Sequence, residues 1–226
     1  MGRAYRGTMT GMTSTSARSE PEAEHQVGVG PWDGPLPDDP RYDPELLADG
    51  DRRNVADQYR YWSVEAIVAD LDTRRHPFHV AIENWAHDLN IGSVVRTANA
   101  FNAAGVHIVG RRRWNRRGAM VTDRYLHVTH HPDAVTLAEW AASAGSLPII
   151  GIDNVPGSVP IEGYALPREC VLLFGQESTG LTAEAQAACD VVLHITQYGS
   201  TRSINAGAAA AIAMHSWIEQ HGSGPA

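Results

Sequence analysis

The chain has 226 residues, 43% of them hydrophobic, which is enough for one compact domain with a tail. No stretch approaches the roughly 18 apolar residues that a membrane helix needs, and no apolar segment of a secretory signal follows the first arginines. We therefore expect a cytoplasmic protein without a membrane partner. Cys170 and Cys189 have no metal-ligand spacing, so we expect both to be reduced residues of the core.

The net charge of −8 argues against a nucleic-acid partner, but the charge is unevenly distributed. Residues 1–50 contain nine acidic and four basic side chains, a net of −5, so the remaining residues carry only −3. All 18 basic residues are arginine, which excludes Schiff-base lysines and lysine-centred phosphate loops. Five of them form a local basic segment with one tryptophan: Arg111, Arg112, Arg113, Trp114, Arg116 and Arg117.

Three regions are expected along the chain. Residues 1–53 are rich in Pro, Gly, Ser, Thr and acidic side chains, which predicts a disordered or loosely ordered tail. Residues 54–77 form a leading segment, in which apolar residues from Asn54 to Asp72 recur at helical spacing. Residues 78–226 form the main domain.

The main domain alternates between short apolar segments and helical segments. The expected strands are His79–Ile82, Val106–Val109, Pro148–Ile152, Val171–Phe174 and Val191–Ile195. The expected helices are Ile91–Phe101, Ala134–Ala144, Ala183–Ala188 and Ile204–Gln220. This alternation predicts an α/β fold with a mostly parallel sheet and helices on both faces. Ligands of such sheets bind beyond the carboxyl ends of the strands.

The first segment with possible chemistry runs from Glu83-Asn84 through Asn90 to Phe101. Ile91, Val94, Val95 and Ala98 mark a buried helix face, and Arg96 lies off that face. An arginine there can hold a phosphate or polarise a hydroxyl, and it can equally be a surface residue paired with a carboxylate.

The second segment, Leu172 to Leu181, is a buried strand that leads into a polar loop containing Glu177. Gly175 and Gly180 would let the backbone approach a ligand closely, although a tight turn with an exposed glutamate would look the same. No GxGxxG stands between strand and helix here.

The third segment runs from Ile195 through a polar loop into a helix whose first turns are rich in Ala and Gly. Ser203 fits the N-cap of this helix, with Asn205 two residues inside it. Capping explains the serine alone, but it explains the whole polar loop less well. The small residues suit close packing against another helix or subunit.

Taken in order, the three segments resemble the TrmH/SpoU branch of the SPOUT RNA methyltransferases over residues 78–220. The family patterns are N-x-G-x-x-x-R-T-A, a hydrophobic residue before G-x-E-x-x-G, and S-L-N at the start of a helix. The chain has Asn90-Ile-Gly with Arg96-Thr-Ala, Phe174-Gly-Gln-Glu with Gly180, and Ser203-Ile-Asn205. Asn102, where relatives often have glycine, and Thr196, where they often have proline, depart from the pattern and could alter the loops.

The resemblance implies a C-terminal trefoil knot, S-adenosylmethionine held in the knotted loops, and a homodimer. Carried over residue by residue, it implies a cofactor site at Ile152, Gly175, Gln176, Glu177, Ile195, Gln197, Ser203 and Ile204. It also implies methyl transfer to a ribose 2′-hydroxyl of RNA, with Arg96, Asn90, Glu177, Ser203 and Asn205 as catalytic residues.

In this scheme Asn90, Ser203 and Asn205 hold the arginine and the ribose, and Glu177 fixes the loop or the arginine. The family proposal makes Arg96 the base, yet a guanidinium stays protonated in proteins. Arg96 can instead orient and stabilise the developing alkoxide, and the destination of the proton is left open.

RNA binding is expected at Arg111–Arg117, with Trp114 stacking on a base, although a solvated charged loop is the alternative. The second and third segments look most like members that methylate a D-loop guanosine of tRNA, which favours tRNA over ribosomal RNA. A ribosomal RNA enzyme, a base methyltransferase of the wider group and a non-catalytic RNA-binding knotted module remain as alternatives.

A metal site is not expected. The cluster of His127, His130 and His131 lacks a nearby cysteine and a helical i, i+4 pair of ligands. We interpret it as a polar loop that runs into Pro132 and Asp133.

Overall fold

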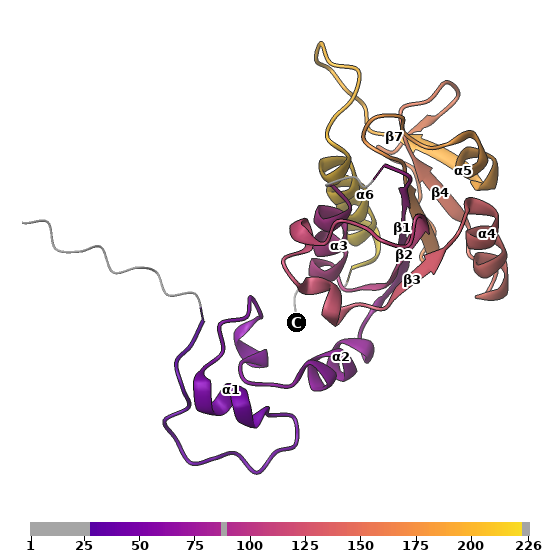
Figure 1. The fold of residues 1–226 in the computed structure, drawn as a ribbon. Helices are drawn as coiled ribbons and strands as arrows, with labels where there is room; N and C mark the ends of the chain where they lie inside the picture. Colours follow the sequence, from indigo (N-terminus) through magenta and orange to yellow (C-terminus); the bar gives the residue numbers. More distant parts are fainter. Residues whose placement is uncertain (1–27, 87–89, 223–226) are drawn as a thin grey trace, which may run out of the picture. The chain divides into compact units, whose positions relative to one another are not determined.

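A seven-stranded sheet forms the centre of the main domain in the computed structural model, which describes residues 28–86 and 90–222 (Figure 1). The strands are β1 His76–Asn84, β2 Ala103–Gly110, β3 Val128–His131, β4 Ile149–Ile152, β5 Val159–Pro160, β6 Cys170–Phe174 and β7 Val191–His194. Their order is β3-β2-β1-β6-β4-β7-β5, and all neighbouring pairs are parallel. The prediction of a mostly parallel sheet is confirmed.

Helices cover both faces of the sheet, as the sequence predicts. Helices α3 (Asn90–Ala100) and α6 (Ala206–His221) lie on one face, and α4 (Ala134–Ser143) and α5 (Ala183–Ala188) lie on the other (Figure 1). Alternate residues of β1 serve the two layers, since Val80 belongs to the core under α3 and α6 and Ala81 to the core under α4 and α5. No helix in the described part is long and apolar enough to cross a membrane.

Two strands were not predicted. Strand β5 has only two residues. Strand β3 contains His130 and His131, so the interpretation of these residues as a polar loop is wrong. Parallel pairing with β2 gives the backbone of β3 its hydrogen bonds. The His131 ring is buried, and its centroid lies 5.9 Å from that of the Trp140 ring.

The leading helix is shorter than the predicted Asn54–Asp72. Helix α2 covers Val64–Asp72, and a 3-10 turn, η1, occupies Asp57–Tyr59. Tyr61 between them has a left-handed φ of 63°, which no helix can continue through. Ser63 then caps α2, because its hydroxyl accepts a hydrogen bond from the Ala66 amide at 3.1 Å.

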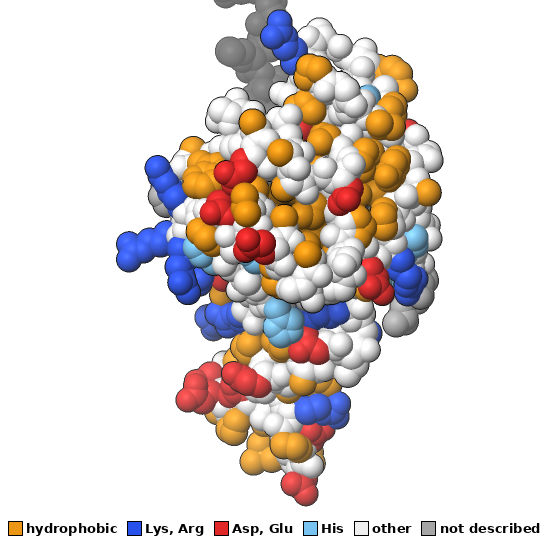
Figure 2. Space-filling model, turned by 90° about the vertical axis from the view of Figure 1, so that its right-hand side faces the viewer, with side chains coloured by type: hydrophobic (Ala, Val, Ile, Leu, Met, Phe, Trp, Pro, Cys, Tyr) orange, Lys and Arg blue, Asp and Glu red, His pale blue; other side chains and the backbone are white. Residues whose placement is uncertain are grey.

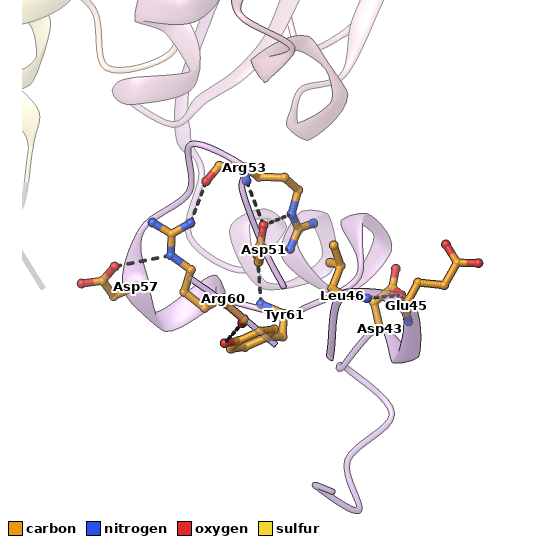
Figure 3. Close-up of polar contacts among 9 residues, drawn as sticks. Asp43, Glu45, Leu46, Asp51, Arg53, Asp57, Arg60 and Tyr61 are labelled. Carbon is orange, nitrogen blue, oxygen red and sulfur yellow. Dashed lines mark hydrogen bonds and ion pairs between the residues drawn. The ribbon is translucent and has the colours of Figure 1, made fainter. Parts of the chain in front are cut away.

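Residues 28–38 and 43–61 belong to a separate compact unit, so the prediction of a loosely ordered tail is wrong for residues 28–53. Helix α1 (Pro44–Asp49) is capped by Asp43, and the buried carboxylate of Asp51 ties the unit together (Figure 3). Asp51 accepts hydrogen bonds from Arg53 at 2.7 Å and from the Tyr61 amide at 3.0 Å. Burial raises the pKa of Asp51, but the bonds from Arg53 and Tyr61 outweigh it and hold the pKa at about 2. The rest of the predicted tail, residues 1–27, lies outside the described residues.

A row of three histidines crosses the sheet on the side of α4. His107 bonds to His79 at 3.0 Å and to His131 at 2.9 Å, and its ring lies 4.0 Å from that of Trp140, centroid to centroid. Burial lowers the pKa of His79 to about 4 and, with the neighbouring histidines, that of His107 to about 2. The row is therefore neutral at physiological pH.

Both cysteines are free, as expected. Cys170 is buried in β6 and Cys189 is half-buried after α5. Burial raises the pKa of both thiols to about 12, so neither is a reactive nucleophile.

Candidate active site

A pocket of about 280 Å³ opens at the carboxyl ends of β4, β6 and β7. This is the edge of a parallel sheet at which ligands bind. Its lining includes the following residues: Ile152, Asp153, Phe174, Gly175, Gln176, Glu177, Gly180, Ile195, Gln197, Ser203, Ile204 and Ala206. All eight residues of the predicted cofactor site are among them. Asp153 was not predicted, although its place directly after a strand was a usable signal.

Glycine is required in the turn after β6. A Cβ on Gly175 would lie 2.1 Å from the Gly180 carbonyl carbon, and Gly180 has a left-handed φ of +68°. The Gln176 and Gly180 amides bond to each other's carbonyls at 3.1 and 2.9 Å, which closes the turn. The Asp153 carboxylate accepts a hydrogen bond from the Leu181 amide at 2.7 Å and thereby fixes the turn to the end of β4.

The three predicted motifs meet in one hydrogen-bonded cluster. Asn90 at the start of α3 donates to the Glu177 carboxylate at 2.5 Å. Asn205 donates to Asn90 Oδ1 at 2.9 Å and to Glu177 at 3.2 Å. Residues separated by as many as 115 positions in the sequence are thus in direct contact. We call Asn90, Glu177 and Asn205 the amide–carboxylate cluster.

The N-cap of α6 is Asn205, so the prediction of Ser203 in that role is wrong. The Asn205 side chain accepts a hydrogen bond from the Ala208 amide at 3.2 Å, and the helix begins at Ala206. Ser203 lies before the cap, is exposed and lines the pocket. Its hydroxyl is therefore available to a ligand instead of to the helix.

The first turns of α3 and α6 pack closely against each other. A Cβ on Gly207 would lie 3.3 Å from the Ser93 Cβ and 3.7 Å from Asn90 Oδ1. This contact holds the start of α3 beside the start of α6, where the amide–carboxylate cluster lies.

Arg96 is exposed, two helical turns or less from the start of α3. No hydrogen bond or ion pair joins it to another residue within 28–86 and 90–222. Of the two roles predicted for Glu177, the contacts fit fixing of the loop, because its carboxylate accepts hydrogen bonds from the two asparagines. The Arg96 guanidinium therefore remains available to a substrate.

The loop between β7 and α6 lines the pocket with residues near its two ends, and hydrogen bonds hold both ends. The Thr196 amide and hydroxyl both donate to the Glu162 carboxylate at 2.9 Å. Asn154 donates to the Arg202 carbonyl at 3.2 Å. Within this loop, Gln197 Oε1 is buried and has no hydrogen-bond donor in the described part of the chain. A buried acceptor without a donor is costly, so it suits a ligand with an N–H or O–H group.

The two departures from the family pattern are accommodated locally. Asn102 has a left-handed φ of 48°, which asparagine tolerates better than most residues, and it donates to the Arg74 carbonyl at 3.1 Å. Thr196 supplies the two bonds to Glu162 described above, which a proline could not make.

The arginine segment follows β2 and is held by Asn84 at the end of β1, a residue whose role was not predicted. The Asn84 amide donates to the carbonyls of Arg111 at 2.6 Å and Arg113 at 2.9 Å. All five arginine side chains are exposed. Trp114 is half-buried against the core on the α3 side, and the Arg116 guanidinium lies 5.4 Å from its ring centroid. Less of this ring is therefore accessible to a base than we expected.

The ring nitrogens of the histidine cluster already have partners. His127 bonds to Asp72 at 2.8 Å, His130 to the Gly110 carbonyl at 2.7 Å and His131 to His107. Among the residues described, no group of His, Cys, Asp and Glu side chains is arranged to hold a metal ion.

Two RNA methyltransferases are similar to this chain in sequence. A tRNA (guanosine(18)-2′-O)-methyltransferase from Borreliella burgdorferi is 26% identical over 151 residues, which cover 66% of this chain and 69% of the relative. A 23S rRNA (uridine(2479)-2′-O)-methyltransferase from Streptomyces viridochromogenes is 25% identical over 193 residues, covering 80% of this chain and 67% of the relative.

Solved structures share the fold. The SpoU methyltransferase AviRb from Streptomyces viridochromogenes, in complex with the cofactor AdoMet, superposes with a TM-score of 0.57 at 24% identity. The match covers 67% of this chain and 60% of that one, so this chain spans less than two thirds of that relative. The profile of the SpoU rRNA Methylase family matches residues 77–215. These residues include all three motifs, and the chain belongs to the SpoU rRNA methylase family.

Proposed function

We propose that the chain is an S-adenosylmethionine-dependent methyltransferase that modifies a ribose 2′-hydroxyl of RNA. The observation that carries the proposal is the amide–carboxylate cluster, because it unites all three family motifs at the edge of the pocket. The names of the relatives, one acting on tRNA and one on ribosomal RNA, support the same reaction class.

The residues that line the pocket suit S-adenosylmethionine in their chemistry. Ile152, Phe174, Ile195 and Ile204 offer apolar surface to an adenine, and the turn at Gly175 brings the backbone close to it. The orphaned Gln197 Oε1 supplies an acceptor for an amine or hydroxyl of the cofactor. When bound, S-adenosylmethionine supplies an electrophilic methyl group on its sulfonium.

The catalytic residues divide their roles by position. Arg96 is exposed and has no partner among the described residues, so its charge stabilises the 2′-oxygen as negative charge develops on it. Ser203, also exposed at the pocket, positions the ribose. Asn90, Glu177 and Asn205 hold the loops that carry these groups, because hydrogen bonds join the three side chains to one another.

RNA approaches from the side of the pocket mouth and the arginine segment. Arg111, Arg112, Arg113, Arg116 and Arg117 are exposed, and they provide contacts to phosphates. The α4 and α5 side suits RNA less well, because carboxylates and hydrophobic side chains occupy the middle of that face and arginines lie at its margins (Figure 2).

We favour tRNA as the substrate, and a D-loop guanosine as its target. The first support is the likeness of the second and third motifs to members with that specificity. The relative from Borreliella burgdorferi, whose name specifies guanosine 18 of tRNA, adds to it. Ribosomal RNA is the second candidate, favoured by the relative from Streptomyces viridochromogenes.

Nucleoside mass spectrometry of total tRNA and ribosomal RNA from cells lacking the protein tests this proposal. We expect one 2′-O-methylated nucleoside to disappear, from tRNA in the favoured case. Loss of a base-methylated nucleoside would identify a base methyltransferase. An unchanged profile, together with no calorimetric binding of S-adenosylmethionine, would identify a non-catalytic module.

A trefoil knot and a cytoplasmic homodimer complete the proposal. Support for the knot comes from contacts of α6 with the segment before β6. The Trp217 indole donates to the Pro167 carbonyl at 3.1 Å, and the Gln220 side chain accepts from the Leu166 amide at 2.9 Å. Support for the dimer comes from the outer surface of α6, where Ala208 and Ile212 are exposed, Ile212 by 41%.

A further inference from the structure

Tyr198 is the most exposed aromatic side chain in the described part of the chain. Its exposure is 95%, and the next most exposed aromatic residue is Trp32 at 39%. A single exposed side chain is common on protein surfaces and carries no meaning alone. Tyr198, however, lies on a loop whose two ends line the pocket.

Tyr198 lies in the loop between β7 and α6, which projects from the domain at the top of Figure 1. On one side of it, Gln197 lines the pocket, and on the other side Ser203 and Ile204 do so. The ring therefore stands on a loop whose two ends form the pocket wall.

Hydrogen bonds fix both ends of the loop that carries Tyr198. The hydrogen bonds of Thr196 to Glu162 and of Asn154 to the Arg202 carbonyl hold its two ends. Between these anchors, nothing lies within 4 Å of the position of a Cβ on Gly199, so there is open space beside the tyrosine. The exposed side chain of Arg202 adds positive charge to the same loop.

An exposed aromatic ring and an exposed arginine on one loop, whose two ends line the pocket, match the chemistry of an unpaired nucleotide. Bases in single-stranded loops of RNA stack on aromatic side chains, while phosphates pair with arginine. Trp114, the residue predicted for this role, is half-buried and partly covered by Arg116. Tyr198 has both faces of its ring available.

We propose that Tyr198 stacks on a base of the RNA substrate, at or beside the target nucleotide, and thereby positions the ribose at the pocket. This inference rests on the proposed function, since it takes the pocket to be the site of methyl transfer. Tyr198 is a substrate-binding and specificity residue, and it takes no part in the chemistry of the 2′-oxygen.

The test measures methyl transfer by the full chain from tritiated S-adenosylmethionine to total tRNA and ribosomal RNA of cells lacking the protein. We expect Tyr198→Ala to raise the KM for RNA roughly 5- to 150-fold, the range expected when one base no longer stacks on an aromatic ring. The affinity for S-adenosylmethionine, measured by calorimetry, should stay unchanged. Tyr198→Phe should behave like the wild type, because stacking uses the ring and not the hydroxyl. Ser200→Ala, an exposed change in the same loop, is the matched control.

Three outcomes would overturn the inference: a wild-type KM in Tyr198→Ala, an equal defect in Tyr198→Phe, or a change in oligomeric state with unaltered RNA affinity. The last result would assign the ring to contact with a second copy of the chain. If the wild type methylates neither RNA, the proposed function fails. RNA binding in the presence of S-adenosylhomocysteine then still tests Tyr198 through the same variants.

Discussion

The turn after β6, which lines the pocket, and the exposed side chains that we propose to contact RNA differ in how the protein holds them. In the turn, Gly175 touches the backbone at Gly180, and Asp153 ties the turn to β4. Ser203 in the pocket lining, Tyr198 on the same loop and Arg96 on α3 are exposed, and no hydrogen bond to another described residue fixes their side chains. The turn is thus held by backbone contacts and a carboxylate, whereas the three side chains that we propose to contact RNA have no hydrogen-bond partner in the described part of the chain.

The largest expected effect is on S-adenosylmethionine binding, when a methyl group is added to Gly175 in the turn after β6. Gly175→Ala places a methyl group 2.1 Å from the Gly180 carbonyl carbon and 2.2 Å from the Leu181 nitrogen, and the backbone cannot yield there without opening the turn. We expect S-adenosylmethionine binding to fall by at least about 100-fold, as the turn that forms the pocket wall is lost. Calorimetry measures the affinity, and circular dichroism checks that the variant is folded.

Gly199→Ala is the matched control, because it lies in the neighbouring loop with nothing within 4 Å of the added methyl group. It should bind the cofactor like the wild type. If Gly175→Ala also binds S-adenosylmethionine like the wild type, the turn after β6 is not part of the cofactor site. The contrast between this turn and the exposed side chains then fails.

A smaller effect, on the salt dependence of RNA affinity, is expected when arginines of the segment 111–117 are neutralised. Replacing Arg111, Arg112 and Arg113 with glutamine removes three exposed charges while Asn84 still holds their carbonyls. The slope of log affinity against log salt should decrease by about 0.7 to 0.9 for each phosphate that the variant no longer neutralises. Binding of labelled total tRNA between low and moderate salt measures it. Arg168→Gln, a change at an exposed arginine before β6, should leave the slope unaltered. An unchanged slope in the triple variant would place the RNA surface elsewhere.

The free energy of unfolding should fall in acid because of the buried histidines of the sheet, which lie outside the pocket. His79 and His107 have lowered pKa values when folded, about 4 and about 2, whereas the unfolded chain takes up protons below about pH 6.5. The free energy of unfolding is therefore highest above about pH 6.5 and decreases as the pH falls from there towards 4. His79 alone contributes roughly 2 to 3 kcal/mol to this decrease. Urea unfolding at pH 7.5 and 5.0 measures the loss.

Replacing the central histidine of the row, in His107→Leu, should make this pH dependence less steep, because the contribution of His107 is lost while that of the buried His79 remains. His215→Gln is the control, because its side chain is 59% exposed. A pH dependence as steep in His107→Leu as in the wild type would show that other groups cause the acid sensitivity.

Much of the fold could be predicted from sequence periodicity. Helix α5 agrees with its prediction residue for residue, and α3 and β6 agree to within one residue at each end. Helix α2 was overextended because apolar spacing does not reveal a left-handed residue such as Tyr61. Strand β3 was missed because its histidines look polar in the sequence, whereas in the fold His131 bonds to His107 and His130 to the Gly110 carbonyl.

The site could be predicted as a set of residues but not as a network. Family resemblance pointed to Asn90, Glu177 and Asn205, yet only the folded chain brings them within hydrogen-bond distance. Capping preferences alone favoured Ser203, because both Ser and Asn are good caps and the sequence does not fix where α6 begins. The exposure of Tyr198 and the burial of Trp114 depend on tertiary packing and could not be predicted from the sequence.

Arg96 is expected to serve the reaction and not the cofactor pocket, and single-turnover methyl transfer by Arg96→Ala tests this central claim most directly. With saturating S-adenosylmethionine and total tRNA as substrate, we expect the rate to fall by at least about 100-fold, because the developing negative charge loses its partner. Calorimetry should give an affinity for S-adenosylmethionine within about twofold of the wild type, since Arg96 is not among the residues that line the pocket. Turnover near the wild-type rate in this variant would contradict the assignment of Arg96 to the reaction.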